Sequence, residues 1–396
     1  MYTSNVLKIL YSPRKTLKEV IQNPKYIGPL LIIILLIAVN VASTYIVLSK
    51  EYYEQILPNG TNAQILDQWT ENSSYWASPN ANITESSDAI NGSIYGSVSI
   101  AFSAQNTSQV STLLTGIGTV NCSGPDGFNL LSFRTKYASN DTLPENVTIQ
   151  IFSYNSSSDY FYSNLTDTFS DAAYNVWNNV TIQLNSSYAL TQFNSSAWHA
   201  YGNADWGNVT GLQLQFTWAS ISNVTLLVDG LFFHGPFKSL LEIGGSAYLL
   251  EYGISAVFEF VVTWILLTGL IYVLVKAFKG KIVWKPALIA VGLILMTMFI
   301  AAVINGIAYS TLPTIRYPLA IIGGVQGEGT AAYNTISSQI SSVALISTIV
   351  EYLVWAWTAA LASIVVRTVT EFSWGKSVAI ALIAYLITIV IAAFIS

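Results

Sequence analysis

The sequence predicts an α-helical membrane bundle of five spans, with an all-β sandwich inserted after the first span. The composition indicates a membrane protein, because 52% of the 396 residues are hydrophobic and only 9% are charged, against roughly 25% charged residues in soluble domains. The charges are also unevenly placed: residues 51–236 contain 14 Asp and Glu but only two basic residues, Arg134 and Lys136. This acidic middle alternates apolar and polar residues as strands do, whereas both ends are apolar and edged by Lys and Arg.

Five apolar stretches are long enough to cross a bilayer, since a spanning helix needs about 20 mostly apolar residues. The first is too long for the apolar core of a cleaved signal peptide, so we expect an uncleaved anchor. The predicted spans are 27–48, 248–275, 287–311, 341–366 and 377–395. The predicted organisation is a cytoplasmic amphipathic segment at 1–26, the first span at 27–48, the β-sandwich at 49–236, and the other four spans within 237–396.

Three clusters of basic residues orient the spans, because Lys and Arg collect in cytoplasmic loops. One cluster precedes the first span, a second lies at 276–285, and Arg367 and Lys376 bracket the turn before the last span. Alternation of the spans puts all three clusters on one side. We therefore expect a multi-pass protein of the cell membrane with a cytoplasmic N-terminus, and with residues 49–236, the 312–340 loop and the C-terminus outside.

The basic segment before the first span has the signals of a short helix. Pro13 suits the first helical position, and Asn23 precedes a proline that ends the helix. Leu17, Val20 and Ile21 share one face. Either this face lies on the inner leaflet, or the segment is a solvated basic stretch that only sets the orientation.

The middle of the chain is dense in Asn-x-Ser/Thr sequons, and "NVTIQLNSSYALTQFNSS" (179–196) alone contains three. All 15 sequons lie in the segment that the basic clusters place outside, so sidedness and sequon location agree. We expect covalent N-glycans at most of these sites. The sequons begin at Asn59, Asn72, Asn82, Asn91, Asn106, Asn121, Asn140, Asn146, Asn155, Asn164, Asn179, Asn185, Asn194, Asn208 and Asn223. A surface with so few ionised side chains also suits an acidic medium, and the composition resembles that of archaeal thermoacidophile envelope proteins.

The external segment shows period-two patterning bounded by Asn, Gly, Ser and Asp, which predicts strands of a β-sandwich. The predicted strands are 96–103, 128–136, 146–153, 177–184, 209–218 and 224–233. A glycosylated Asn must face solvent, so the sequon positions also predict the faces of two strands. The inward side chains are Val147, Ile149, Ile151, Val180, Ile182 and Leu184, and the outward ones include Asn179, Thr181 and Gln183. The single cysteine, Cys122, cannot make an intrachain disulfide, so this domain depends on its core or on a metal.

A run of phrases in these strands resembles the galactose-binding-like jelly roll of carbohydrate-binding modules. The phrases are "GSVSIAF", "FNLLSFRTK", "WNNVTIQL", "ADWGNVTGLQLQF" and "LLVDGLFF", within about residues 85–234. The resemblance implies a structural calcium ion at Asp229, whose alternative role is to cap the turn to Gly230. It also implies sugar binding by aromatic stacking, for which Trp198 and Trp206 in loop-like sequence are the candidates, with Asp205 as a hydrogen-bond partner. The alternative is that these rings pack in the core.

The remaining segments resemble the five spans of YIP-family membrane proteins. The matching stretches are "LKILYSPRKTLKEVIQNPKYIGPLLIIILLI", "LIYVLVKAFKGKIVWKPALIAVGLI" and "VWAWTAALASIVVRTVTEFSWGKSVAIALIAYLI". Eukaryotic members of the family bind Rab-type GTPases and work in vesicle traffic. The large external domain departs from the family pattern, so the resemblance does not extend to that role here.

Four polar residues fall at similar depths within the predicted spans: Asn40, Glu259, Asn305 and Glu351. Ionisable groups inside a membrane are costly and mark functional sites. They predict either a cluster that handles protons or cations, or a set of interhelical hydrogen bonds made by neutral carboxyl groups.

The sequence contains no catalytic or phosphate-binding motif. The glycine-rich stretch "IGGVQGEGT" (322–330) is predicted to be a flexible connector, and Asp126, Asp205 and Asp229 have no carboxylate partner at a recognisable spacing. We therefore expect a non-enzymatic envelope protein that presents a glycosylated jelly roll for binding or scaffolding. The alternative is a transport or accessory subunit of a membrane complex. The expected partners are the lipid bilayer and other envelope or membrane-complex proteins, and glycans in the first case, without nucleic acid; no cofactor is expected apart from a structural calcium ion.

Overall fold

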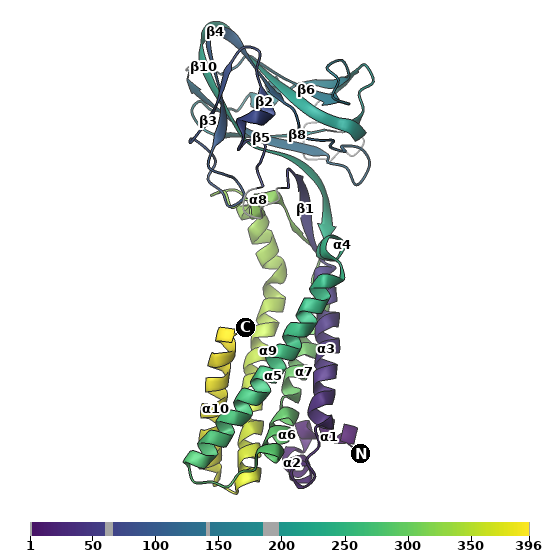
Figure 1. Cartoon of the computed structure of the whole chain (residues 1–396), viewed down its shortest axis with the longest axis vertical. Coiled ribbons are helices and arrows are strands. Elements are labelled where there is room, and N and C mark those ends of the chain that lie inside the picture. The colour runs from purple at the N-terminus through teal and green to yellow at the C-terminus, as the bar shows by residue number, and fades with distance from the viewer. Residues whose placement is uncertain (1, 60–65, 140–142, 185–197, 396) are drawn as a thin grey trace. The chain divides into compact units, whose positions relative to one another are not determined.

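The computed structural model describes residues 2–59, 66–139, 143–184 and 198–395. The chain divides into two compact units. The helical unit comprises Met1–Tyr52, Ser239–Ile315 and Ile336–Ser396, and the β unit comprises Tyr53–Lys238 and Arg316–Thr335 (Figure 1). The β unit is thus built from the predicted insertion together with a second, distant segment of the chain.

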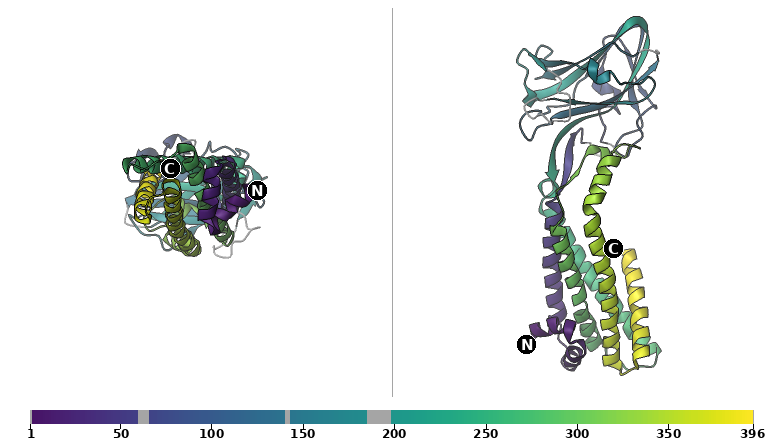
Figure 2. Two further views of the ribbon diagram at one scale, coloured as in Figure 1. Left: turned by 90° about the horizontal axis from the view of Figure 1, so that it is seen from below. Right: turned by 180° about the vertical axis from the view of Figure 1, so that it is seen from behind.

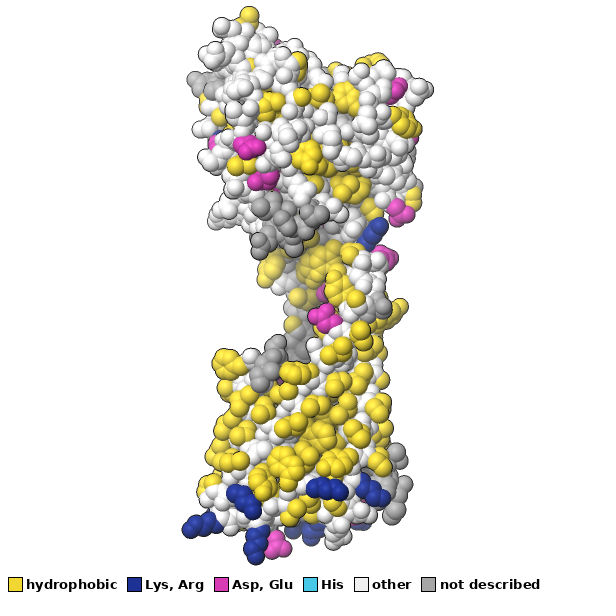
Figure 3. Space-filling view, in the orientation of Figure 1, with side chains coloured by type: hydrophobic (Ala, Val, Ile, Leu, Met, Phe, Trp, Pro, Cys, Tyr) yellow, Lys and Arg dark blue, Asp and Glu magenta, His cyan; other side chains and the backbone are white. Residues whose placement is uncertain are grey.

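The helical unit contains five helical segments, among the described residues, that are long and apolar enough to cross a membrane. Their number and order confirm the prediction. The helices are α1 (Tyr2–Tyr11), α2 (Pro13–Gln22), α3 (Ile27–Leu48), α4 (Leu240–Gly244), α5 (Ser246–Ala277), α6 (Trp284–Ile294), α7 (Met296–Ser310), α9 (Thr330–Thr370) and α10 (Trp374–Ile395). Figure 2 shows the long helices running side by side, with α3 packed on α5 and α7, and α10 packed on α5. Hydrophobic side chains cover the visible face of this unit, and Lys and Arg gather at one end of it (Figure 3).

The third span is not one continuous helix, since α6 ends at Ile294 and α7 begins at Met296. The hydroxyl of Thr297 donates to the Ile294 carbonyl (3.1 Å) and pairs with the Thr358 hydroxyl of α9 (2.7 Å). A side chain that takes up a backbone carbonyl in this way is a known cause of helix interruption. The break therefore coincides with this side-chain hydrogen bond.

The short basic helix α2 forms as predicted, but its apolar face is not free to lie on a lipid surface. Leu17 is fully buried and Val20 is 9% exposed, and both belong to the core of the helical unit. The helix packs against α6. The N-terminal segment is therefore part of the bundle.

The β unit is one antiparallel sheet of 11 strands within the described residues. Its strands are β1 (Glu51–Leu57), β2 (Trp76–Ala77), β3 (Asn82–Ser86), β4 (Ser99–Leu114), β5 (Leu130–Ser139), β6 (Asn146–Ser153), β7 (Tyr160–Asn164), β8 (Asn178–Gln183), β9 (His199–Tyr201), β10 (Val209–Ser239) and β11 (Ile315–Tyr317). The prediction of separate strands at 209–218 and 224–233 is wrong, because β10 runs through both with register shifts between Thr217 and Val224. Its first half pairs with β6, its second half pairs with β5, and β4 pairs with both halves.

This shared use of β4 and β10 folds the sheet around one core. Val147, Ile149, Ile151, Val180, Ile182 and Leu184 are all buried in it, which confirms the predicted faces. Gln183 was expected to face outward and is buried instead. The Trp198 indole covers this end of β8, and its Nε1 donates to the Gln183 carbonyl (2.8 Å).

Candidate functional site

A cavity of about 760 Å³, open on one side, lies among the helices of the helical unit, and Glu259 and Glu351 are exposed at it. Its walls come from α3, α5, α7, α9 and α10. All four polar residues that the sequence placed at one depth line this cavity: Asn40, Glu259, Asn305 and Glu351. The structure therefore brings together side chains that are up to about 300 residues apart in the chain.

The chemistry of the cavity is acidic and hydroxyl-rich, with aromatic rings beside it. None of the described residues that line it is Lys, Arg or His. Asn40 donates from Nδ2 to the Leu36 carbonyl within its own helix (2.9 Å). Within the described part of the chain, neither Glu259 nor Glu351 makes a hydrogen bond or an ion pair. The remaining hydroxyl and aromatic lining residues are Ser255, Phe258, Thr263, Tyr309, Ser347, Trp355, Tyr385 and Thr388.

Interhelical hydrogen bonds exist elsewhere in the bundle. Trp264 Nε1 of α5 donates to the Leu288 carbonyl of α6 (2.6 Å), and Thr297 pairs with Thr358. Such bonds connect transmembrane helices. Glu259 and Glu351, by contrast, make no hydrogen bond that connects two helices in the described part of the chain.

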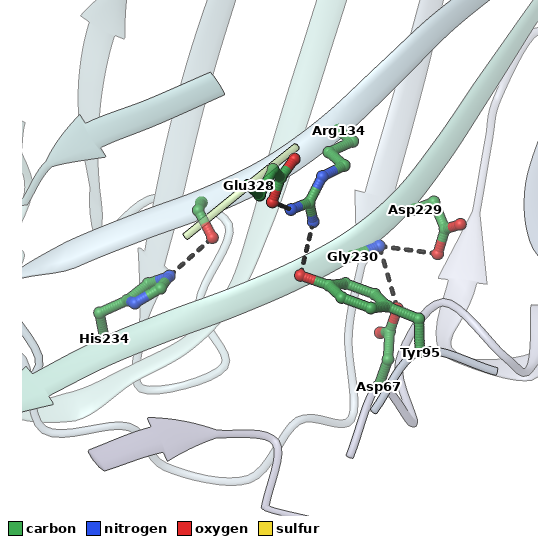
Figure 4. Close-up of polar contacts among 8 residues, drawn as sticks. Asp67, Tyr95, Arg134, Asp229, Gly230, His234 and Glu328 are labelled. Atoms are coloured by element: carbon green, nitrogen blue, oxygen red, sulfur yellow. Dashed lines mark hydrogen bonds and ion pairs between the residues drawn. The ribbon is translucent and has the colours of Figure 1, made fainter. Parts of the chain in front are cut away.

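The β unit contains a buried pair of carboxyl groups around Gly230 (Figure 4). Asp229 Oδ1 accepts from the Gly230 amide (2.7 Å), and Asp67 Oδ2 accepts from the same amide (3.0 Å). Asp229 Oδ2 accepts from the Ile90 amide (2.7 Å), and the Thr70 hydroxyl also donates to Asp229. Gly230 has a φ of 59°, which glycine adopts at little cost. Asp229 and Gly230 both lie within β10, next to a register shift between Asp229 and Phe232, so this carboxyl group accepts at an irregularity of the strand and does not cap a turn.

Burial sets the protonation of this pair. Desolvation raises the pKa of Asp67 well above its usual 3.8, and the negative charge of Asp229 raises it further. Burial also raises the pKa of Asp229, although the amides of Ile90 and Gly230 oppose this. Two adjacent buried carboxyl groups hold a proton between them because both cannot ionise together.

The same residues do not fit a calcium ion. Calcium takes six to eight oxygen ligands, whereas this site offers two carboxyl groups and one hydroxyl, with amide N–H groups already directed at both oxygens of Asp229. The described residues include no group of three or more His, Cys, Asp or Glu that could hold a metal.

Arg134 on β5 holds the second segment of the β unit. Its Nη1 donates to the Tyr95 hydroxyl (2.8 Å), and its Nη2 pairs with the Glu328 carboxylate. The Ser93 hydroxyl donates to the Ile322 carbonyl (2.7 Å). Burial raises the pKa of Tyr95 to about 12, so its hydroxyl stays neutral. The glycine-rich stretch 322–330 is therefore not the flexible connector predicted from its sequence.

Arg134 is not singled out by the sequence patterns considered above, although the sequence contains a signal for it. It is one of only two basic residues between 51 and 236, and it directly follows Phe133 in the predicted strand 128–136. A buried guanidinium requires an acidic partner. That requirement predicts an ion pair, although not with Glu328 in particular.

His234 joins three strands of the β unit. Its Nε2 contacts the Ser132 hydroxyl (2.6 Å), and its Nδ1 contacts the Glu54 carboxylate (3.0 Å), whose other oxygen accepts from the Leu319 amide (2.6 Å). The order Ser–His–Glu is that of a hydrolase triad. Ser132, however, lies in the middle of β5 and is only 7% exposed. The arrangement is therefore a structural hydrogen-bond chain.

The predicted sugar-stacking residues are packed against one another. The Trp206 ring stacks on Phe161 (centroids 3.9 Å apart, 8° between planes) and meets Trp198 edge-on (5.2 Å, 86°). Both tryptophans are partly buried against the main core. Asp205 accepts from the Tyr154 hydroxyl and from Asn208 Nδ2 (2.6 Å each), and from the Gly207 amide (2.8 Å). The Tyr154 hydrogen bond, followed by the Gly207 and Asn208 bonds, lowers the pKa of this carboxyl group.

The sequon asparagines lie at the surface. Three of the 15, Asn140, Asn185 and Asn194, fall outside the described residues. Of the other twelve, Asn146 and Asn208 are half-buried and the rest are exposed. An N-glycan needs an accessible side-chain amide, and ten described positions meet that condition.

Residues 196–395 match the Yip1 domain family. No curated protein matches the chain.

Several solved structures are similar to the β region of this chain, at low identity and low TM-score. An exo-β-agarase aligns with 44% of this chain and 25% of its own length (11% identity, TM-score 0.33), so the chain spans about a quarter of that enzyme. A family 11 carbohydrate-binding module from Clostridium thermocellum was solved with a β-1,3-1,4-mixed-linked tetrasaccharide. It aligns with 46% of this chain and 95% of its own length, at 12% identity and a TM-score of 0.28. A family 30 carbohydrate-binding module of a cellulosomal cellulase of Clostridium thermocellum aligns with 47% of this chain and 98% of its own length, at 13% identity and a TM-score of 0.27.

Proposed function

The chain belongs to the Yip1 domain family and is a multi-pass membrane protein, and from this premise we propose that it displays an N-glycosylated β unit outside the cell. There the β unit binds or scaffolds other envelope components, without enzymatic activity. The observation that carries the proposal is the placement of the sequons. Ten of the twelve described sequon asparagines are exposed, and every one of the 15 belongs to the segment predicted to be outside. A glycan shield requires both conditions.

The charge pattern of the helical unit supports the same sidedness. Lys276, Lys279, Lys281 and Lys285 lie between the second and third spans, where the positive-inside rule puts a cytoplasmic loop. The basic N-terminal cluster precedes α3, and the β unit begins after the other end of this helix, at β1. A glycosylated domain on that side agrees with both patterns.

Mass spectrometry of glycopeptides from native membranes tests the proposal. Occupancy at most of the ten exposed positions is the expected result. Fewer than five occupied sites would defeat the glycan-shield account.

The contacts of the β unit favour scaffolding over sugar binding. The rings of Trp198 and Trp206 are engaged by each other and by Phe161, and the Asp205 carboxylate is fully engaged by Tyr154, Gly207 and Asn208. A glycan array probed with the full-length protein in detergent decides the matter. A specific sugar signal that competes with free sugar would restore the lectin alternative.

A second candidate function is transport, or an accessory role in a membrane complex, based on the intramembrane cavity. The convergence of Asn40, Glu259, Asn305 and Glu351 on one cavity is the observation that favours it. Proton or cation flux in proteoliposomes, compared between the wild type and the Glu259→Gln/Glu351→Gln protein, is the test. Equal flux in both would reject the transport function.

A further inference from the structure

The size of the intramembrane cavity indicates a molecular ligand. Its volume of about 760 Å³ lies within the range of roughly 300–1,000 Å³ that is typical of small-molecule sites. A proton or a bare metal ion would leave most of this space empty. A molecular ligand of this volume could fill the cavity and also contact its polar groups.

The charge of the lining indicates a cation. Glu259 and Glu351 bring two carboxyl groups, and no described lining residue is basic. Lys276 at the end of α5 is 17 residues from Glu259, or about 25 Å along the helix. Arg367 near the end of α9 is at a similar distance from Glu351. The nearest bases on these two helices are therefore out of reach.

Two further polar atoms of the lining have no hydrogen-bond partner among the described residues. Asn305 Oδ1 and Ser347 Oγ are buried and make no hydrogen bond with the described residues. Unsatisfied polar groups inside a membrane are costly. A positively charged ligand would offset this cost by charge–dipole attraction to these oxygen atoms.

The apolar lining indicates that the cation has a hydrophobic body. Phe258 and Trp355 line the cavity together with Leu36, Val262 and Met298. Aromatic faces attract cations, and this attraction is modest at exposed sites such as that of Phe258, which is 53% exposed. A zwitterionic phospholipid headgroup fits less well, because its phosphate would find no base among the lining residues.

We infer that this cavity binds a lipophilic organic cation, such as a tertiary or quaternary ammonium compound with an apolar body. Glu259 and Glu351 supply the counter-charge, and Phe258 and Trp355 contact the body of the ligand. This inference deepens the second candidate function and rests on the same cavity, but it concerns binding and does not require flux.

Equilibrium dialysis of the full-length protein in nanodiscs tests the inference. The probe is tetraphenylphosphonium, and tetraphenylborate provides a ligand of nearly the same size and opposite charge, with empty nanodiscs as background. We expect saturable binding of the phosphonium and none of the borate above background. Glu259→Gln/Glu351→Gln should weaken phosphonium binding about tenfold or more. Glu251→Gln, an exposed position two turns away on α5, is the matched control and should bind as the wild type does.

Three outcomes would overturn the inference. The first is equal phosphonium binding by the wild type and the double variant. The second is binding of the borate with similar affinity. The third is a co-purifying phospholipid that the wild type retains and the double variant loses. Each single Glu→Gln variant is measured as well, so a double variant that fails to assemble does not remove the test. Charge-selective binding without flux would support the inference while rejecting transport, and neither result bears on the glycan shield.

Discussion

Replacing Asp67 by asparagine is expected to remove a pH-dependent part of the stability of the β unit. Asp67 is fully buried beside Asp229, and burial raises its pKa well above the ordinary 3.8. Asparagine has the shape of the protonated acid. Its carbonyl can accept from the Gly230 amide as Asp67 Oδ2 does, and its amide can donate to Asp229.

The sign and size of the effect follow from proton linkage. Above pH 3.8 an unfolded Asp67 has lost its proton, whereas the folded pair still holds one until the pH passes the raised pKa. The native state therefore binds more protons in this window, and the free energy of unfolding falls as the pH rises. For one proton the slope is about 1.4 kcal/mol per pH unit, which is about 3–6 °C of melting temperature per pH unit for a domain of this size.

The assay uses Cys122, the one cysteine of the chain, which is buried in the core of the β unit. Unfolding of the β unit exposes this thiol, so a disulfide reagent that reacts in acid reports on the β unit specifically. Asp67→Asn and the wild type should open equally below about pH 4. Above that pH the variant should become progressively more stable than the wild type, because only the wild type loses this part of its free energy of unfolding. Asp126→Asn, at an exposed position, is the control. Parallel pH curves for Asp67→Asn and the wild type would refute the reasoning.

Three other features of the molecule give shorter predictions. Asn208 donates both to Asp205 and to the Tyr154 hydroxyl, so we expect it to stay unglycosylated where exposed sequons are occupied; full occupancy in glycopeptide mass spectra would contradict this. A cysteine at Gln105 should react with an impermeant reagent in intact cells and one at Lys281 should not, and the reverse result would invert the topology. Glu328→Gln leaves the guanidinium of Arg134 buried and unpaired, which should cost about 3 kcal/mol in the thiol assay, whereas an unchanged opening rate would show that the pair contributes nothing.

The sequence predicts the helical unit well because the membrane imposes simple conditions on it. Length and hydropathy alone give the five spans, and their alternating direction places Glu259 and Glu351 at one depth. The break between α6 and α7 was not predicted. The Thr297 hydroxyl bonds to the Ile294 carbonyl at this point and pairs with Thr358 on another helix, and neither contact leaves a pattern in the local sequence.

The β unit is predicted less completely, because much of its structure depends on contacts between residues that are far apart in the sequence. The alternation along 146–151 and 179–184 gives the correct faces because it depends only on neighbouring residues. The continuity of β10 was missed because the polar stretch 219–223 reads as a turn, whereas the pairing of Ser222 with Thr107 of β4 holds it in the sheet. Strand pairing over more than 100 residues is set by the fold and not by the segment.

The second segment of the β unit is the feature that a linear interpretation could not give. Residues 316–335 follow α7 in the chain, yet they hold two buried groups of the first segment through the Arg134–Glu328 pair and the bond from the Leu319 amide to Glu54. Until this segment is made, Arg134 is without its carboxylate partner, and a buried unpaired charge is destabilising. A chain that ends after α7 should therefore show a Cys122 thiol that reacts faster than in the full-length protein. The β unit should reach its full stability only once three of the five spans and the segment after them have been synthesised. Equal thiol reactivity in the two chains would mean that the first segment is stable without the second.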